Sequence, residues 1–257
     1  MQASSVIAVF AKPPIPGRVK TRLQGVLSSA RAALLHRACV EDTVAFVCAV
    51  PGCEKWLLAA GTPEDASVLA QDLQLSSDWN CGTQQGRDLG ARMHNALRVF
   101  FDAGATKVVI VGTDTPWMTP QRMRHALRVL DSADVVLGPA ADGGYYLVGA
   151  RRLEPAMFRG IPWGRSGVLA ATLLALAKKR IRYRLLPRDF DLDRPDDLER
   201  AAILLREHPE RAPALAAQLG KRIGTMAEVK SEQRKASGSS LLPAPARPHK
   251  KPRPGRA

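Results

Sequence analysis

The chain has 257 residues, of which 46% are apolar, so it could form one large domain or two small ones around a sizeable core. Lysine and arginine number 38 against 24 acidic residues, a formal net charge of +14 at pH 7. Aromatic residues make up only 5% of the chain and its cations are scattered. This composition argues against a nucleic-acid-binding domain, in which basic residues alternate with exposed aromatic ones.

Three further patterns argue against other classes. No apolar stretch approaches the roughly 18–20 residues that a membrane-spanning helix needs. The first residues, MQASSVIAVFAKPP, lack the basic leader and long apolar run of a signal peptide. The cysteines show neither CxxC spacing nor a histidine at ligand spacing, which argues against a zinc site; they are Cys39, Cys48, Cys53 and Cys81. We therefore expect a soluble, cytoplasmic protein with reduced thiols and no membrane span.

Apolar runs of strand length alternate with longer amphipathic segments along the chain. We expect strands at residues 5–11, 55–60, 107–112 and 181–186, and two more, within 133–140 and 145–150, around a glycine turn. Helices are expected at residues 28–50, 88–103, 120–130, 164–179 and 195–207. Continuous β-branched runs separated by helices are typical of a mostly parallel sheet covered on both faces, and such sheets bind ligands at the carboxyl ends of their strands.

The segment that continues the first expected strand, VFAKPPIPGRVKTRL (residues 9–23), is stiff and strongly positive. It holds three prolines and Gly17 among four cations, which are Lys12, Arg18, Lys20 and Arg22. It matches neither G-x-x-x-x-G-K-[ST] nor G-x-G-x-x-G, the glycine-rich phosphate-binding sequences. Lys20 and Arg22 could still neutralise phosphates through their side chains. The alternative interpretation is a surface turn with incidental cations.

Acidic residues follow other expected strands. Asp114 stands two residues after the third strand, where it could hold Mg²⁺ or Mn²⁺ or cap the next helix. The stretch DFDLDRPDDL carries Asp191 and Asp193 on one side of an extended segment, and one or both could complete a metal site with Asp114. The two acids of the following first helical turn suit the helix dipole and are interpreted as structural; they are Asp196 and Asp197.

The stretch GPAADGGYYLVG (residues 138–149) places Asp142 and two glycines at the same expected strand ends. Gly143 and Gly144 can adopt positive φ and let the backbone approach a ligand closely. Tyr145 or Tyr146 could stack on a sugar or base. A β-hairpin turn explains the D-G-G sequence equally well.

In this order, the segments FAKPPIPGRVKTRL, DLGARM, VGTDTPWM, GPAADGGYYLVG, IPWGRSGVLAAT and DFDLDRPDDL resemble a glycosyltransferase-like family called rSAM/selenodomain-associated transferase. Some of its members are described as arsenosugar-biosynthesis glycosyltransferases, and the resemblance covers about residues 5–205. The family is similar to nucleotide-diphospho-sugar transferases of GT-A fold and to cofactor-precursor nucleotidylyltransferases. The resemblance implies a Rossmann-like, three-layer α/β/α domain, here over residues 1–224, that binds a nucleotide through the first loop.

The resemblance also implies roles for particular residues. Asp114 matches the metal-holding acid of the family's usual GSDCP or GTDCP, and Asp193 matches the second Asp of its usual DVDTPEDL. Nucleotide contacts are implied for Ala11, Lys12, Gly17, Arg18, Lys20 and Arg22. Catalytic roles are expected for Lys20, Asp114 and Asp142, the last as a candidate base or acceptor contact. Acceptor contacts are implied for Gly143, Gly144 and Tyr145.

The chain also departs from the family pattern. Thr115 replaces a common Cys, a change we expect to be harmless, and Arg194 replaces a usual Thr, which adds a cation beside the proposed ligand Asp193. Gly164 and Arg165 stand where Ser-Thr is usual, so acceptor recognition is expected to differ.

The implied chemistry joins a nucleotide donor, a small-molecule acceptor and Mg²⁺ or Mn²⁺, without a covalent enzyme intermediate. The ion and the first-loop cations would stabilise a departing diphosphate while an acceptor oxygen attacks. The family label favours glycosyl transfer from a nucleotide sugar, and the alternative is nucleotidylyl transfer from a nucleoside triphosphate. Nucleic-acid binding and a non-catalytic relative are more remote alternatives.

The two implied metal ligands, Asp114 and Asp193, would repel each other without a cation between them. The metal is therefore expected to bind appreciably only with a nucleotide, whose phosphates supply further oxygen ligands. Removing either acid is expected to relieve strain in the empty site.

Residues 225–257 form a tail rich in Pro and Ser, with eight Lys and Arg residues and two acids. Such a composition cannot bury enough apolar surface to offset chain entropy, so we expect disorder. Its charge could serve nonspecific binding to polyanions or membrane surfaces, or simply keep it solvated. Deleting residues 225–257 should leave the melting temperature and nucleotide binding nearly unchanged. A large drop in melting temperature on truncation would show that the tail packs on the domain.

Overall fold

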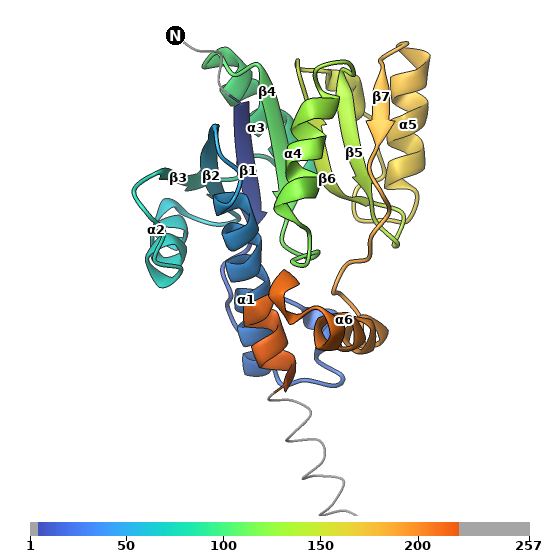
Figure 1. The fold of residues 1–257 in the computed structure, drawn as a ribbon. Helices are drawn as coiled ribbons and strands as arrows, with labels where there is room; N and C mark the ends of the chain where they lie inside the picture. Colours follow the sequence, from blue (N-terminus) through green and yellow to red (C-terminus); the bar gives the residue numbers. More distant parts are fainter. Residues whose placement is uncertain (1–4, 221–257) are drawn as a thin grey trace, which may run out of the picture. The chain divides into compact units, whose positions relative to one another are not determined.

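The computed structural model describes residues 5–220 (Figure 1). Residues 1–4 and 221–257, which include the tail predicted at 225–257, lie outside the described part. The strands and the long helices described below all belong to one unit of the chain, Met1–Leu219.

Within residues 5–220, seven strands form one sheet: β1 (Ser5–Ala11), β2 (Cys53–Ala59), β3 (Trp79–Thr83), β4 (Lys107–Gly112), β5 (Val135–Pro139), β6 (Tyr145–Ala150) and β7 (Tyr183–Leu185). Their order across the sheet is β3-β2-β1-β4-β6-β5-β7 (Figure 1). Neighbouring strands pair in parallel except at β6, which is antiparallel to both β4 and β5. The sheet is therefore mostly parallel, as predicted.

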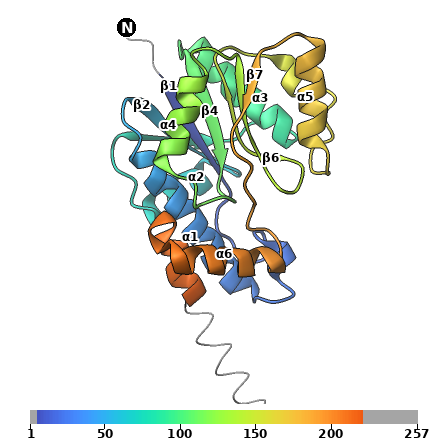
Figure 2. The same ribbon diagram turned by 45° about the vertical axis from the view of Figure 1, so that its right-hand side comes forward.

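Helices cover both faces of this sheet (Figures 1 and 2). One face carries α1 (Ser29–Cys48), α2 (Pro63–Asp72) and α4 (Pro120–Val129), and the other carries α3 (Leu89–Asp102) and α5 (Val168–Lys178). Beyond the end of the sheet, α6 (Pro195–Glu207) and the helical residues 213–219 pack beside α1. Single 3₁₀ turns span Thr21–Leu23, Pro155–Met157 and Pro209–Arg211. This arrangement confirms the predicted three-layer α/β/α architecture.

The central strands are apolar towards both layers of helices. On β4, Val108 and Ile110 pack with α3, whereas Val109 and Val111 pack with α1 and α4. Because side chains alternate along a strand, a strand that is buried on both faces needs apolar residues at successive positions. The run KVVIVG is therefore a strong strand signal.

A third buried cluster joins the first loop to the C-terminal elements. Leu23, after the first loop, packs with Trp117 after β4 and with Leu192 just before α6. The Trp117 ring stacks on Phe190, with 4.2 Å between the ring centroids. These contacts hold the first loop, the β4–α4 connection and the segment before α6 against one another at the carboxyl edge of the sheet.

Most predicted elements are confirmed, and the differences have physical reasons. The helix predicted from residue 164 begins only at Val168, because Gly164 and Gly167 have φ of +78° and +95°, outside the helical region. The sequence patterns missed α2 and β3. β3 is an edge strand in which only Trp79 is buried, so it has no continuous apolar run.

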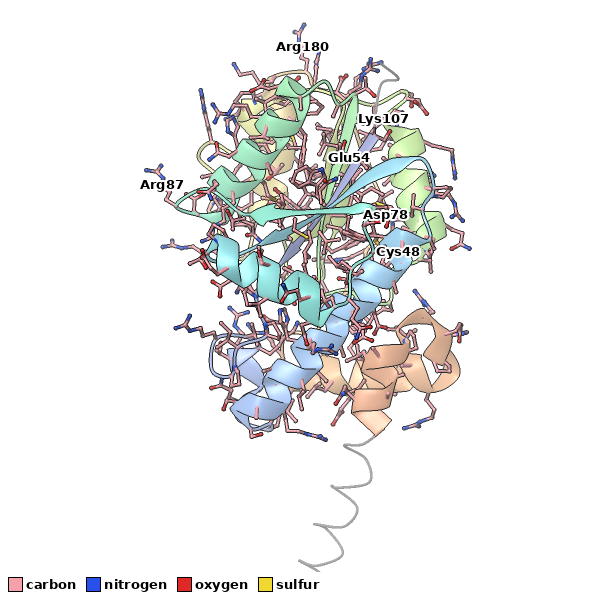
Figure 3. All side chains as sticks on the ribbon, turned by 90° about the vertical axis from the view of Figure 1, so that its left-hand side faces the viewer. Cys48, Glu54, Asp78, Arg87, Lys107 and Arg180 are labelled. Carbon is pink, nitrogen blue, oxygen red and sulfur yellow. The ribbon has the colours of Figure 1, made fainter. Side chains whose placement is uncertain are left out.

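Charged side chains project from several parts of the surface (Figure 3). Arg87 and Arg180 extend in different directions, and Lys107 at the start of β4 pairs with Asp131. Among the helices within residues 5–220, none is both long and apolar enough to cross a membrane.

Gly149 on β6 lies between Val109 of β4 and Val136 of β5. A Cβ there would stand 2.8 Å from Val136 Cγ1 and 3.0 Å from Val109 Cγ2, and β-branched side chains cannot turn away freely. Gly149→Ala should therefore lower the free energy of unfolding by about 1–3 kcal/mol in a denaturant titration. The matched control is Gly25→Ala, where nothing lies within 4 Å, and it should have little effect. Equal stability of the two variants would contradict this packing.

Candidate functional site

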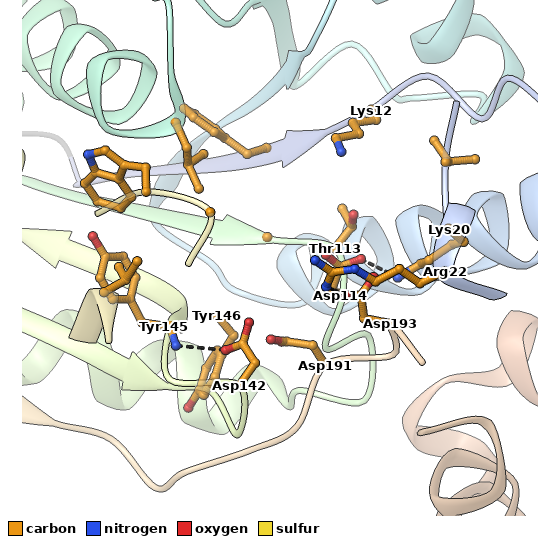
Figure 4. A pocket seen from close by; sticks show the side chains of 18 of the residues that line it. Lys12, Lys20, Arg22, Thr113, Asp114, Asp142, Tyr145, Tyr146, Asp191 and Asp193 are labelled. Carbon is orange, nitrogen blue, oxygen red and sulfur yellow. Dashed lines mark hydrogen bonds and ion pairs between the residues drawn. The ribbon is translucent and has the colours of Figure 1, made fainter. Parts of the chain in front are cut away.

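The carboxyl ends of β1 and β4 and the start of β6 border a cavity of about 930 Å³ (Figure 4). Its lining includes parts of the first loop, the β4–α4 connection, the β5–β6 turn and residues 163–168 and 191–197. β1 stands between β2 and β4 in the sheet. The chain adds β2 and β3 on one side of β1 and then crosses to add β4 on the other side. Open α/β sheets bind ligands at this position.

The first loop takes its shape from its glycine and one of its prolines. The Arg18 N–H donates to the Ile15 carbonyl at 3.0 Å across Pro16 and Gly17, and Gly17 has a φ of +83°, as in a type II turn. Lys20 also has a left-handed backbone, with a φ of 47°, which is uncommon for a residue with a side chain. The Lys20 side chain is buried, whereas Arg18 is exposed.

The Lys20 ammonium is the centre of the site. It donates to the Asp114 carboxylate and, at 2.5 Å, to the carbonyl of Leu192 (Figure 4). The side chain of Lys20 is 2% exposed, and that of Asp114 is 53% exposed, so Asp114 faces the cavity. Burial lowers the pKa of Lys20, but the adjacent Asp114 carboxylate offsets this and holds the pKa above its ordinary value. Burial likewise raises the pKa of Asp114, and Lys20 reverses the shift, so both groups are charged at neutral pH.

A second ion pair lies beside the first. The Arg22 guanidinium donates to the Asp193 carboxylate at 2.5 Å, and both side chains are partly exposed. Each acid predicted to hold a metal is thus bound by a cation predicted to bind phosphate. The expected strain between Asp114 and Asp193 is therefore wrong for this structure, because removing Asp114 would leave a buried ammonium without its counter-ion.

The alternative in which Asp114 caps the next helix is also wrong. The hydroxyl of Thr119 caps α4 by accepting from the Arg122 N–H at 3.2 Å. The Asp114 carboxylate is free of this task and pairs with Lys20.

Asp191 also contributes a carboxylate to the cavity wall. The hydroxyl of Thr115 donates to it at 2.9 Å, so the residue that replaces the family's usual Cys has a hydrogen-bonding partner here. Burial, and then the nearby carboxylates of Asp114 and Asp142, raise the pKa of Asp191 to about 7. Asp191 therefore holds a proton more readily than an ordinary carboxyl group.

Hydrogen bonds on either side of Asp191 and Asp193 fix the segment that carries them. Asp189 accepts from the Trp117 indole at 2.9 Å and from the Arg122 guanidinium. Asp197 accepts from the backbone N–H groups of Asp193 at 3.0 Å and of the next residue at 2.7 Å, which agrees with its predicted role at the start of α6. These bonds fix both acids before any ligand binds.

His36 on α1 also lines the cavity, and the sequence analysis did not single it out. Its Nε2 lies 3.0 Å from the Lys12 carbonyl, and its buried Nδ1 has no hydrogen-bond partner within residues 5–220. Burial, and then the charge of Lys20, lower its pKa to about 4. A lone histidine on a helix carries no sequence signal for this position.

The β5–β6 turn forms the opposite wall. The Asp142 carboxylate accepts from the Gly144 N–H at 2.8 Å, and the Gly143 carbonyl accepts from the Leu169 N–H at 2.9 Å, which ties the turn to α5. The Tyr145 ring lines the cavity, but its hydroxyl is buried beside Thr172, and burial raises its pKa. Tyr145 can therefore offer a ligand its ring and not its hydroxyl.

One wall of the cavity is made by the start of α3, to which the sequence analysis assigned no site residue, and by residues 163–168, of which it linked only Gly164 and Arg165 to acceptor recognition. Trp163 packs so closely on α3 that a Cβ at Gly90 would stand 2.1 Å from its Nε1. The charged residues that these two segments contribute are Arg92 and Arg165. In the sequence, only the glycine at position 90 in DLGARM indicates that another side chain could approach α3 this closely.

The predicted site residues divide into two groups. Those that line the cavity are Ala11, Lys12, Lys20, Arg22, Asp114, Asp142, Gly144, Tyr145 and Asp193. Those that do not are Gly17, Arg18 and Gly143, which shape the turns on either side of it.

This fold is that of nucleotide-diphospho-sugar transferases. A crystal structure from Desulfovibrio desulfuricans, described as a "putative nucleotide-diphospho-sugar transferase", is 31% identical to this chain, with a TM-score of 0.81. The match covers 87% of this chain and 97% of the other. Residues 43–165 match the family model described as "Uncharacterized protein conserved in bacteria (DUF2064)". The chain belongs to this family.

More distant structures share the fold alone. A 4-diphosphocytidyl-2C-methyl-D-erythritol synthase from Anaerococcus prevotii is 10% identical, with a TM-score of 0.53 over 79% of this chain and 96% of the other. A second synthase of this name is 11% identical, with a TM-score of 0.50 over 80% and 99%. No curated protein matches the chain.

The lowered pKa of His36 predicts a pH dependence of stability. Its pKa is about 4 in the folded chain against an ordinary 6.5, so the unfolded chain binds its proton first as the pH falls. The stability that depends on neutral His36 is complete above about pH 6.5 and is lost towards pH 4, by about 2–3 kcal/mol. His36→Gln should remove this part of the slope in unfolding titrations at pH 4–7. The exposed His125→Gln is the control, and identical slopes for both variants would contradict the prediction.

Proposed function

We propose that the chain is a metal-assisted transferase that uses a nucleotide donor. The observation that carries the proposal is the convergence of Lys20–Asp114 and Arg22–Asp193 on one cavity at the ligand-binding edge of the sheet. Cations for phosphate and carboxylates for a metal are the groups that transfer from a nucleotide donor needs. The description of the 31% identical protein supports the same class.

The residues present fit Mg²⁺ or Mn²⁺, which prefer carboxylate and phosphate oxygens. Asp114 and Asp193 would hold the ion, and Asp191 lies on the same wall. Within residues 5–220, no group of three or more His, Cys, Asp and Glu side chains is arranged to hold an ion alone. Donor phosphates would therefore complete the ligand set. When bound, the ion would supply positive charge to the departing phosphate oxygens.

The chain's own groups would bind and orient the reactants. Lys12 is exposed on the cavity wall and forms no ion pair within residues 5–220, so it is a cation free to meet donor phosphates. Asp142, whose carboxylate is exposed across the cavity, is the candidate base for an acceptor hydroxyl. The backbone of Gly144 and the ring of Tyr145 would contact the acceptor.

Glycosyl transfer from a nucleotide sugar is the reaction we propose first, since the description of the Desulfovibrio protein favours it. Attack at the anomeric carbon would release a nucleoside diphosphate. Nucleotidylyl transfer would instead release pyrophosphate from a nucleoside triphosphate, so product analysis with each donor class and Mn²⁺ separates the two reactions.

The metal dependence of nucleotide binding tests the class. Calorimetry with nucleotides and nucleotide sugars should show binding at least about tenfold tighter with Mn²⁺ than without it. Asp114→Asn should abolish this gain and Asp193→Asn should reduce it, because each removes a hard oxygen ligand. Asp196→Asn, in the exposed first turn of α6 and off the cavity wall, is the matched control.

Melting curves must accompany these titrations, because Asp114→Asn leaves the buried Lys20 unpaired and should lower the melting temperature. Affinities are compared well below the lowest melting temperature. The proposal fails if the wild type shows no metal dependence or if Asp114→Asn keeps it in full.

A further inference from the structure

The two ion pairs leave open how a metal ion could bind to carboxylates that already have cationic partners. The Lys20 ammonium already occupies one carboxylate oxygen of Asp114, and Arg22 already occupies Asp193. A divalent cation at Asp114 would stand next to a buried ammonium, and like charges at such short range repel each other. The acids are therefore compensated, and a metal alone meets a site that has already been neutralised.

The environment of Lys20 shows what exchange of partners would require. Its side chain is 2% exposed, and its other acceptor is the Leu192 carbonyl, which cannot neutralise a charge. An ammonium that loses Asp114 therefore needs another anion within reach. A diphosphate in the cavity offers such oxygens and would release Asp114 for a metal at the same time.

The backbone at Lys20 is compatible with this exchange. The φ of 47° costs conformational energy in a residue with a side chain, and such strain persists only where the surroundings hold it. The residue is held by the ion pair, by the hydrogen bond to Leu192 and by the Leu23 N–H, which donates to the Lys20 carbonyl at 2.9 Å. A change of partner at Lys20 would thus involve a backbone that is already away from its preferred geometry.

We propose that Lys20 and Arg22 are resident counter-cations of Asp114 and Asp193, and that metal and diphosphate enter together by exchanging partners with them. This inference rests on the proposed function, since it takes the donor's diphosphate as the incoming anion. Lys20 excludes a lone metal ion from Asp114, and Arg22 does so more weakly at the more exposed Asp193. The device makes metal binding conditional on a bound polyphosphate.

The test is Mn²⁺ binding to the nucleotide-free protein. It is measured by calorimetry or by the loss of the EPR signal of free Mn²⁺. Lys20→Met keeps the length of the side chain and removes its charge, so it should bind Mn²⁺ at least about tenfold more tightly than the wild type. Arg18→Met removes an exposed cation two residues away that is off the cavity wall, and it should leave Mn²⁺ binding unchanged. Unchanged Mn²⁺ affinity in folded Lys20→Met would overturn the inference.

A second variant covers the case in which Lys20→Met does not fold. The Arg22 side chain is 58% exposed, so Arg22→Met should fold, and it should raise Mn²⁺ affinity by about two- to fivefold. No gain in Arg22→Met would then overturn the inference.

The nucleotide titrations keep the two proposals apart. The variants could bind Mn²⁺ more tightly although the protein binds no nucleotide. That result would refute the proposed function and the diphosphate as incoming anion, but it would leave the counter-cation role of Lys20 and Arg22 intact. Metal-dependent nucleotide binding without any Mn²⁺ gain in the variants would refute the counter-cation role alone.

Discussion

A buried ammonium cannot stand without a counter-ion, and the site is built around this constraint. Lys20 comes from the first loop, Asp114 from the end of β4 and the Leu192 carbonyl from the segment before α6, so one side chain joins three distant parts of the chain. The Leu192 N–H in turn donates to the Asp114 carbonyl at 2.7 Å. The same positive charge helps to keep neighbouring His36 neutral. The charge balance of the site and the path of these three chain segments therefore depend on each other.

The cavity has two halves of different construction. On the side of Lys20 and Asp193, ion pairs and the hydrogen bonds of Asp189 fix every acid in place. The wall around Trp163 instead depends on a close approach to Gly90 and on glycines with positive φ. The first half is thus held by charge, whereas the second is held by packing and backbone conformation. The departures from the family pattern at Gly164 and Arg165 fall in this second half.

Much of the fold was accessible from the sequence because buried strands and amphipathic helices have distinct periods. The position of Asp114 followed from the same pattern, since a strand that ends at Gly112 must deliver the next residues to the carboxyl edge. The ion pair between Lys20 and Asp114 could not be predicted from the sequence. Lys20 and Asp114 are 94 residues apart, and a cation after a strand fits a phosphate contact as well as an internal ion pair. The Tyr145 hydroxyl is buried beside Thr172 of α5, a tertiary contact that local sequence cannot specify.

The order of β1 and its partners has a consequence for synthesis of the chain. β1 is made first but pairs on one side with β4, in the register Ser5 opposite Lys107. Until Asp114 leaves the ribosome, Lys20 has no counter-ion and must remain in water. Leu192 and Asp193 follow all seven strands along the chain, so a nascent chain can complete the sheet before this wall of the cavity exists.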